Sequence, residues 1–241
     1  MRYRDLTLRH ELKYYLPDAD YQVVRKRLRG FLIPDEHMPT PEGYHVRSLY
    51  FDTPDFHERV AKESGVECRT KTRIRVYQKS TNRIRFEQKV KVNQYIGKRM
   101  AQITQQEYAA ICSGETSILL SSKEPLIHRF YAEQKIRQLR PAAIVDYMRE
   151  AYLYPAGNVR ITFDRNLQVG VGDFSTLSSD EGLYLRPVYP PGMMTLEIKF
   201  DSFLPAAVQR LVRPYTARRS EISKYLMCMQ NLDFMKGINQ R

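Results

Sequence analysis

Several stretches of this sequence alternate polar and apolar residues, and their polar positions are mostly lysine and arginine. The clearest examples are the stretches 69–77 and 83–92. Successive side chains of a strand point to opposite faces of a sheet, so each such strand has one apolar face and one charged face. The apolar face needs a core to pack against. The pattern therefore limits the chain to folds built on antiparallel strands with one dry and one charged face.

The charged positions of the predicted strands form an unusually uniform set. A single strand of this kind is typical of a half-exposed sheet whose solvated side is basic. An ordinary solvated face also mixes serine, threonine, asparagine and glutamine, whereas this set is mostly lysine and arginine, and its repetition on distant strands favours one shared site. The set comprises Arg9, Glu11, Lys13, Arg69, Lys71, Arg73, Arg75, Tyr77, Arg83, Arg85, Glu87, Lys89, Lys91, Tyr147, Arg149, Arg160, Thr162, Asp164, Thr195, Glu197 and Lys199.

A Glu-x-Lys motif occurs on three of these strands and places a carboxylate and an ammonium group side by side on one face. A barrel with its charged positions inside would bring these faces together around a lumen large enough for a ligand. Cations at that density repel one another in a low-dielectric cavity, so we expect a bound polyanion. The carboxylates are then expected to hold Mg²⁺ or Mn²⁺, hard cations that bridge phosphate oxygens. The three pairs are Glu11 with Lys13, Glu87 with Lys89, and Glu197 with Lys199.

We expect one α+β domain over residues 1–241, dominated by antiparallel strands. Strands are predicted over 9–16, 44–52, 68–78, 83–92, 143–152, 159–164, 183–187 and 194–200. Helices are predicted over 19–31, 55–62, 105–112, 122–139, 205–212 and 221–233. The polar tetrapeptide 79–82 indicates a hairpin turn. Thr104 followed by Glu107 has the form of a capping box.

The overall charge narrows the class of partner. The chain has 39 lysines and arginines against 27 aspartates and glutamates, a formal net charge of +12. Such a surplus destabilises a folded domain by self-repulsion unless an anionic partner offsets it. Nucleic acid, an acidic membrane surface and a small polyanion such as a nucleotide or polyphosphate would each satisfy the charge.

The remaining composition predicts a cytoplasmic chain without a transmembrane segment. No run of about 18 apolar residues is present, and the N-terminus lacks the apolar core of a signal peptide. Cys68, Cys112 and Cys228 have no C-x-x-C spacing, so we expect reduced, structural thiols. A peripheral position on the inner face of a membrane is an alternative, through the basic helix face 25–29 and the terminal Lys236 and Arg241. A solvated helix face is the simpler interpretation.

Motifs of several unrelated enzymes are absent. The sequence has no G-x-x-x-x-G-K-[ST] loop, no complete G-x-G-x-x-G, no H-E-x-x-H and no G-x-S-x-G. His10 lies on the apolar side of its strand and is expected to be packed. The pattern argues against nucleic-acid binding, because stacking platforms need aromatic rings among the cations, whereas Phe86, Phe163 and Phe200 share the apolar face. A non-catalytic polyanion-binding module is a further alternative.

The order and spacing of eight motifs resemble a known family over nearly the whole chain. The sequence resembles the triphosphate tunnel metalloenzymes (CYTH-like superfamily), and within them the polyphosphate polymerase domain of the vacuolar transporter chaperone (VTC) complexes and its bacterial relatives. Each motif is weak when taken alone. The motifs are RHELKY at 9–14, SLYFD at 48–52, RIRVY at 73–77, FEQK at 86–89, YMREAY at 147–152, VRITFD at 159–164, LEIK at 196–199 and SKY at 223–225.

The resemblance implies an antiparallel eight-stranded β-barrel tunnel with a polar, basic lumen, flanked by several helices. Within it, the γ-phosphate of ATP would be transferred to a growing inorganic polyphosphate chain with Mn²⁺ or Mg²⁺ as cofactor. By the resemblance, Glu197 is the metal ligand, and Tyr147 and Ser223 donate hydrogen bonds to phosphate. The remaining phosphate ligands that it implies are Lys13, Arg59, Arg73, Arg75, Lys89, Lys98, Arg149, Arg160, Lys199 and Lys224. Glu11 and Glu87 are expected to belong to the same phosphate and nucleotide site.

The first strand departs from the pattern of the wider superfamily. Glu-x-Glu-x-Lys is frequent there, whereas this chain has Arg9-x-Glu11-x-Lys13. The missing carboxylate weakens the case for two-metal hydrolysis and fits the polymerase branch. A triphosphatase of the same superfamily is the remaining catalytic alternative. ATP and inorganic polyphosphate are the expected partners, with a membrane protein as an expected partner in trans.

Overall fold

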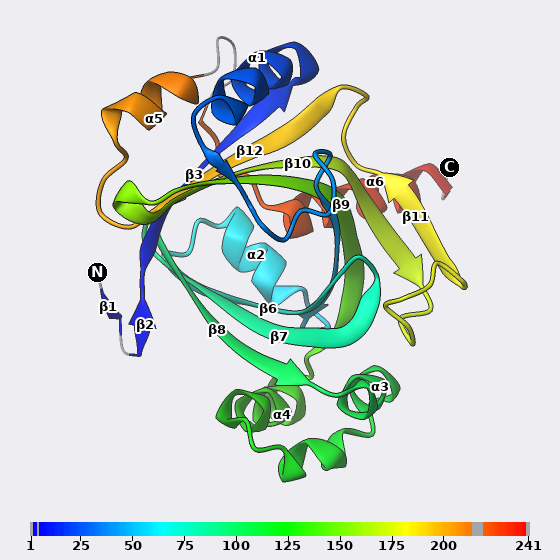
Figure 1. Cartoon of the computed structure of the whole chain (residues 1–241). Coiled ribbons are helices and arrows are strands. Elements are labelled where there is room, and N and C mark those ends of the chain that lie inside the picture. Colours follow the sequence, from blue (N-terminus) through cyan, green and yellow to red (C-terminus); the bar gives the residue numbers. More distant parts are fainter. Residues whose placement is uncertain (1, 4, 214–218, 240–241) are drawn as a thin grey trace.

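The computed structural model describes residues 2–3, 5–213 and 219–239 of the chain (Figure 1). Eight strands pair in one closed ring in which every ladder is antiparallel. The ring follows the order β3 (Arg9–Pro17), β8 (Tyr95–Ile103), β7 (Ser80–Val92), β6 (Cys68–Tyr77), β5 (Tyr44–Asp52), β9 (Arg140–Tyr154), β10 (Val159–Gly172) and β12 (Met193–Phe200), which returns to β3. The predicted α+β fold around an eight-stranded antiparallel barrel is therefore confirmed.

Four short strands and several helices complete the fold. Strands β1 (Arg2–Tyr3) and β2 (Leu6–Thr7) pair with each other, while β4 (Ile33–Pro34) and β11 (Leu183–Pro187) extend the barrel beside β9 and β10. The α-helices are α1 (Asp18–Arg29), α2 (His57–Glu63), α3 (Gln105–Ser113), α4 (Pro125–Arg137), α5 (Ala206–Leu211) and α6 (Lys224–Asn239). The 3₁₀ helices are η1 (Thr116–Ser121) and η2 (Ala156–Asn158).

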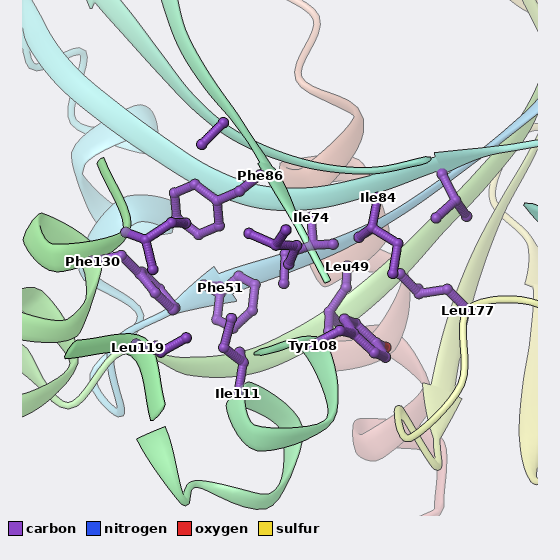
Figure 2. Packing of buried hydrophobic residues seen from close by; sticks show 14 of the residues in the cluster. Leu49, Phe51, Ile74, Ile84, Phe86, Tyr108, Ile111, Leu119, Phe130 and Leu177 are labelled. Atoms are coloured by element: carbon purple, nitrogen blue, oxygen red, sulfur yellow. The ribbon is translucent and has the colours of Figure 1, made fainter. Parts of the chain in front are cut away.

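The apolar faces of the strands point out of the barrel and are covered by helices. Leu49, Ile74 and Phe86 from β5, β6 and β7 pack against Phe130 of α4 and Tyr108 of α3 (Figure 2). On the opposite side, α1 and α5 cover β3 and β12 (Figure 1). Because the core lies outside the ring, the charged faces of the same strands are left to line the lumen.

Helix α6 covers one part of the lumen from within. Its Tyr225, Cys228 and Met229 form a third apolar cluster with β5, β9 and β10, including Val46 and Val145. Val46 lies two residues from the cavity-lining Tyr44 and shares its side of β5, so this cluster is on the inner face of the barrel. The inner surface is therefore apolar beneath α6 and charged elsewhere.

Asp52, at the end of β5, joins helices α2 and α6. Its Oδ1 accepts hydrogen bonds from the backbone N–H groups of Thr53 and Glu58, at 2.8 and 2.9 Å. Its Oδ2 accepts one from the Tyr225 hydroxyl at 2.6 Å. A carboxylate at a helix N-terminus satisfies otherwise unpaired backbone donors, so Asp52 fixes the start of α2 and anchors α6 with one side chain.

Strand β8 was not among the predicted strands. Its residues do not alternate cleanly, since Gly97 interrupts the pattern between Ile96 and Lys98. The reason for the glycine is tertiary: a Cβ at this position would lie 2.8 Å from Leu8 Cδ2 and 3.2 Å from Leu6 Cβ. Contact between β8 and the β1–β2 hairpin therefore outweighs local propensity here.

Several element boundaries also differ from prediction. The hairpin turn predicted over 79–82 instead uses Gln78 and Lys79, both with φ of 53°, and β7 already begins at Ser80. The helix predicted over 122–139 ends at Arg137, because Gln138 adopts a left-handed conformation with φ of 54°. The polar tetrapeptide resembled a loop because its side chains lie at the exposed start of a strand.

Two strands are longer than predicted and one helix is displaced. Strand β9 begins at Arg140 and includes Pro141, and β10 continues past Asp164 to Gly172 through an irregularity between Arg165 and Gln168. Helix α6 begins at Lys224, not at 221. Both strands extend into residues whose polar and apolar side chains do not alternate cleanly. Pairing with distant strands, not the local pattern, therefore sets where these strands begin and end.

Candidate functional site

The barrel encloses a cavity of about 1160 Å³. Among the residues that the structure describes, eight lysines and nine arginines line it, against four acidic residues. The basic lumen predicted from strand parity is therefore confirmed. The predicted site residues that line it are Glu11, Lys13, Arg73, Arg75, Lys89, Lys98, Tyr147, Arg149, Arg160, Glu197, Lys199, Ser223 and Lys224.

Two predicted site residues do not line the cavity. Glu87 is fully buried beneath it, where it forms ion pairs with Arg73 at 2.6 Å and Lys98 at 2.8 Å. Arg59 lies on α2, and its guanidinium pairs with Glu63 at 3.2 Å and with Asp233. The structure does not bring Arg59 to the other predicted ligands, because its helix directs it toward α6.

One side of the cavity carries a lysine wall, which we define as Lys13, Lys89 and Lys199 with the carboxylates Glu11 and Glu197. The β3–β12 register places Lys13 opposite Glu197 and Glu11 opposite Lys199. Glu11 lies 3.1 Å from Lys13 Nζ and 3.0 Å from Lys89 Nζ. Glu197 lies 2.8 Å from Lys199 Nζ and 3.5 Å from Lys13 Nζ. Two of the three Glu-x-Lys motifs therefore form one cluster.

The third motif behaves differently. Glu87 and Lys89 are neighbours on β7, yet Lys89 pairs with Glu11 of β3, which lies beyond β8, and Glu87 pairs with Arg73 on the adjacent β6. Arg73 lies directly opposite Glu87 in the β6–β7 ladder, and such residues lie closer together than residues two apart on one strand. The expectation of three equivalent pairs is thus replaced by two different clusters.

The lysines keep both carboxylates of the lysine wall ionised. Burial and the nearby Glu197 would raise the pKa of Glu11, but Lys13, Lys89 and Lys199 outweigh them and lower that pKa to about 2. Burial would likewise raise the pKa of Glu197, and Lys199 and Lys13 lower it well below its usual range. Burial lowers the pKa of Lys89 well below the usual lysine value, despite its contact with Glu11.

The carboxylates of Glu11 and Glu197 suit a divalent cation that phosphate oxygens also coordinate. Both ionised carboxylates belong to one cluster, since each contacts Lys13 and Lys199. Within the described part of the chain, no group of three or more His, Cys, Asp or Glu residues is placed to hold a metal. Mg²⁺ is usually held by one or two carboxylates with the remaining positions filled by water and substrate phosphates, and this donor set suits that arrangement.

The opposite side carries an arginine wall, which we define as Arg73, Arg75 and Arg149 with the tyrosines Tyr50 and Tyr147. Arg73 donates from Nε to Glu87 at 2.8 Å and from Nη1 to the Tyr50 hydroxyl at 2.8 Å. Arg75 donates to Ser48 Oγ at 2.9 Å and to the Tyr147 hydroxyl at 3.0 Å. These contacts fix the planes of both guanidinium groups, as recognition of phosphate by paired hydrogen bonds requires.

Arg149 is held by a buried carboxylate that the sequence did not single out as a site residue. It donates to Asp164 from Nε at 2.7 Å and from Nη2 at 2.8 Å, and Lys224 Nζ lies 2.5 Å from the same carboxylate. Burial would raise the pKa of Asp164, but Arg149 and Lys224 lower it to about 2. Asp164 therefore orients one cation from β9 and one from α6.

Lys71 and Lys91 also line the cavity; both were on the predicted charged faces but had no predicted role. Lys71 contacts Ser223, with 2.7 Å between Nζ and Oγ. Glu221 is exposed and accepts from Lys62 at 2.6 Å and from Lys91 at 2.8 Å. Lys71 lies two residues before Arg73 on β6, so the sequence predicted that both side chains point to the same face. The contact of Lys71 with Ser223 was not predictable, because no local pattern indicates where α6 packs.

The remaining predictions can be placed on the structure. Arg160 pairs with Asp35 at 2.6 Å, and His10 stacks on Phe200 with ring centroids 4.8 Å apart. The three cysteines are free thiols. On α1, Arg25 pairs with Glu150 at 2.8 Å.

The basic C-terminal residues fall largely outside the part of the chain that the structure describes. The side chain of Lys236 and the whole of Arg241 lie outside the described residues. Across the described residues, the structure contains no helix with the length and apolar character needed to cross a membrane.

The closed barrel and its cationic lumen define the class of protein, a β-barrel tunnel with a basic interior. The family model described as the VTC domain matches residues 8–233. The chain belongs to the VTC domain family. The family resemblance predicted from the sequence is therefore confirmed.

Two of the solved structures similar to this chain come from Pyrococcus horikoshii and Vibrio parahaemolyticus. The PH1819 protein of Pyrococcus horikoshii OT3 is 15% identical, with a TM-score of 0.47 over 93% of this chain and 99% of that chain. The VpR19 protein of Vibrio parahaemolyticus, described as a candidate adenylate cyclase, is 11% identical, with a TM-score of 0.48 over 92% and 97% of the two chains. No curated protein matches this chain.

Proposed function

We propose that this protein transfers the γ-phosphate of ATP to a growing inorganic polyphosphate chain inside the barrel. The observation that supports this most strongly is the lumen itself, in which lysines and arginines from seven of the eight barrel strands and from α6 converge on one cavity. A cavity with such a surplus of cations is best stabilised by a polyanion that threads along it. Membership of the VTC domain family supports the same substrate class.

Phosphoryl transfer suits the groups present. The reaction asks little covalent chemistry of the protein and depends on positioning and on stabilising charge on the transferred group. Arg73 and Arg75, whose planes are fixed by Tyr50 and Tyr147, would hold phosphate oxygens through paired N–H donors. Lys13 and Lys199 would supply point charges from the opposite side, and Lys89 would donate hydrogen bonds beside them. The acceptor would be an oxygen of the existing polyphosphate chain.

Glu11 and Glu197 would hold the divalent cation together with the phosphates. When bound, Mn²⁺ or Mg²⁺ would neutralise charge on the phosphate oxygens that it bridges. The lysines around the two carboxylates keep them ionised and thus ready to bind a cation. Lys13 contacts both carboxylates and would hold them at a fixed separation.

The test is incubation of the purified chain with ATP and either Mn²⁺ or Mg²⁺. Products are separated on a gel that resolves polyphosphate, and released orthophosphate is assayed in parallel. We expect a ladder of long chains. Orthophosphate without polymer would indicate a triphosphatase, and neither product with intact polyphosphate binding would indicate a binding module.

Matched variants distinguish the effect of cavity residues from the effect of the overall positive charge of the protein. We expect Arg75→Ala, Lys199→Ala and Glu197→Gln each to lower turnover about 10²-fold or more with the fold retained. Arg210→Ala, which removes an exposed arginine of α5 outside the cavity, should retain it. Wild-type turnover in all three site variants would contradict the proposal.

A further inference from the structure

Lys71 on β6 differs from every other lysine of the cavity. Within the described residues, the seven other lysines that line the cavity each have a carboxylate oxygen within 4.0 Å. Lys71 has no such ion pair among them. Its Nζ instead lies 2.7 Å from the hydroxyl oxygen of Ser223 and 5.5 Å from the ring centroid of Tyr225. A half-buried lysine with a serine as its close polar partner is the arrangement of a Ser–Lys pair.

The surroundings of Lys71 favour a neutral amine. Burial lowers its pKa, and the nearby Lys13 and Arg69 lower it further, to about 7. Glu58 on α2 opposes this shift, while Lys62 on the same helix adds to it. In a large fraction of the molecules, the Lys71 amine is therefore uncharged near neutral pH, and its lone pair can accept a proton.

Ser223 presents a hydroxyl group that is already oriented. It immediately precedes α6, and its Oγ accepts a hydrogen bond from the backbone N–H of Leu226 at 3.3 Å. Lys71 Nζ donates to the same oxygen at 2.7 Å, and when that amine is neutral the O–H of Ser223 can donate to it instead. The adjoining carbonyl of Ile222 accepts from Lys13 Nζ at 3.0 Å, which joins this segment to the lysine wall. The hydroxyl therefore lies where the proposed phosphates would bind.

We propose that Ser223 is itself a phosphoryl acceptor and that Lys71 takes its proton, so that the protein can start a polyphosphate chain on its own side chain. The inference rests on the proposed function. Ser223 Oγ forms a bond to the γ-phosphorus of ATP, the bond from that phosphorus to the β,γ-bridging oxygen breaks, and ADP leaves. The hydroxyl proton passes to Lys71. A phosphate oxygen of the phosphoserine is then the acceptor for the next transfer.

The charges in the cavity are better paired after phosphorylation of Ser223 than before it. Protonated Lys71 becomes an ammonium group beside the new phosphate, which also lies at the N-terminus of α6 and near Lys13. The step thus converts an amine without a carboxylate partner into one member of an ion pair.

The test measures the intact mass of the full chain after incubation with ATP and Mn²⁺, followed by peptide mapping. We expect added phosphate on Ser223, stable to acid as a phosphate ester is. Ser223→Ala should lose it, and Ser223→Thr, which keeps a hydroxyl group, should retain it. Acid-labile phosphate on lysine, or phosphate elsewhere with Ser223 unmodified, would overturn the proposal.

Lys71→Arg is the sharpest variant, because arginine keeps the positive charge but cannot accept a proton. We expect the rate of Ser223 phosphorylation to fall about 10²-fold or more, as for loss of a general base. In the wild type the rate should rise with pH up to about 7 and then level off, following the neutral form of Lys71. Labelling of Lys71→Arg at the wild-type rate would show that only charge matters and would overturn the proton-acceptor role. The matched control is Lys123→Arg, an exposed lysine outside the cavity.

Failure of this inference and of the proposed function give different results. Free polyphosphate with an unmodified protein would overturn the Ser223 acceptor and leave the polymerase standing. A single phosphate on Ser223, with neither free nor protein-bound polymer, would support the acceptor and contradict the polymerase. Neither product would overturn both.

Discussion

The lysine wall and the arginine wall face the same cavity but are built differently. Glu11 and Glu197 lie among Lys13, Lys89 and Lys199, so this wall consists of alternating full charges. In the arginine wall, Arg73 and Arg75 are held by tyrosine and serine hydroxyls, and its carboxylates Glu87 and Asp164 are fully buried behind the cations. One wall therefore exposes both signs of charge to a ligand, while the other presents oriented donors alone.

This difference assigns different tasks to the two walls. Ionised carboxylates at the cavity surface suit a divalent cation, and oriented guanidinium groups suit phosphate oxygens. A polyphosphate with its bound metal carries both kinds of group. The two walls together would bind both the phosphates and the metal, whereas either wall alone would bind only one of the two.

The largest effect is expected from loss of an oriented donor. Arg75→Ala should lower polyphosphate formation by about 10³-fold, the upper range for removal of one preorganised donor. Arg75→Lys should also be impaired, since an ammonium group cannot make the paired contacts. Initial rates of ADP release would measure both. Full activity of Arg75→Lys would remove the distinction between the two walls, because a point charge would then suffice.

Glu197→Gln tests the lysine wall separately. We expect a loss of about 10²-fold and a higher Mn²⁺ concentration for half-maximal rate, because the amide keeps the shape but not the charge. Glu87→Gln is the matched change behind the arginine wall and should leave the metal requirement as it is. Metal titrations of both variants decide the point, and equal shifts in both would contradict separate tasks.

Acid should affect both walls through Glu11 and Asp164. Each has a folded-state pKa of about 2, below the ordinary values of 4.5 and 3.8. The unfolded chain therefore binds more protons in this range, so the stability that the two groups contribute is present above pH 4.5 and is lost as pH falls toward 2. Thermal melts between pH 6 and pH 2 would measure the decline. Glu11→Gln should flatten the melting temperature in that window, and an unchanged slope would contradict the lysine contacts.

The smallest expected effect concerns Glu221, which is exposed and pairs with Lys62, Arg69 and Lys91 outside both walls. A polyanion that enters the cavity would compete with this carboxylate for its three cations. Glu221→Gln should therefore tighten polyphosphate binding by about 3-fold, as expected for an exposed ion pair. The gain should disappear at high salt because exposed charges are screened. Calorimetric titration at two salt concentrations would test it, and weaker binding would contradict competition.

Strand parity accounts for much of the site. Arg73 and Arg75 were predicted to share a charged face because Ile74 and Val76 had to be dry, and the structure confirms that separation. The alternation carries this information locally, since a side chain on a strand can point to only two faces. The same argument placed Lys13 and Glu197 on inner faces before their pairing was known.

Contacts between distant segments were not predictable in the same way. Lys89 was expected beside Glu87 but pairs with Glu11, and Arg59 was expected in the site but is drawn to Asp233 by the position of α6. Strand β8 escaped prediction because Gly97 is set by contact with Leu8, not by its own neighbours. Each case depends on register or helix placement, which short sequence windows do not contain.

The sequence by itself determined that this chain would form an antiparallel barrel with a basic interior, because periodicity of two and the need to bury apolar faces are local properties. The tertiary structure alone decided which carboxylate faces which cation, because register and helix docking arise from packing of the whole chain. Within the described residues, it also left Lys71 without a carboxylate partner and placed it against Ser223, a pairing between segments more than 150 residues apart in the sequence. The alternation within each strand thus determined which positions carry charge, and the tertiary structure determined which charged groups form pairs.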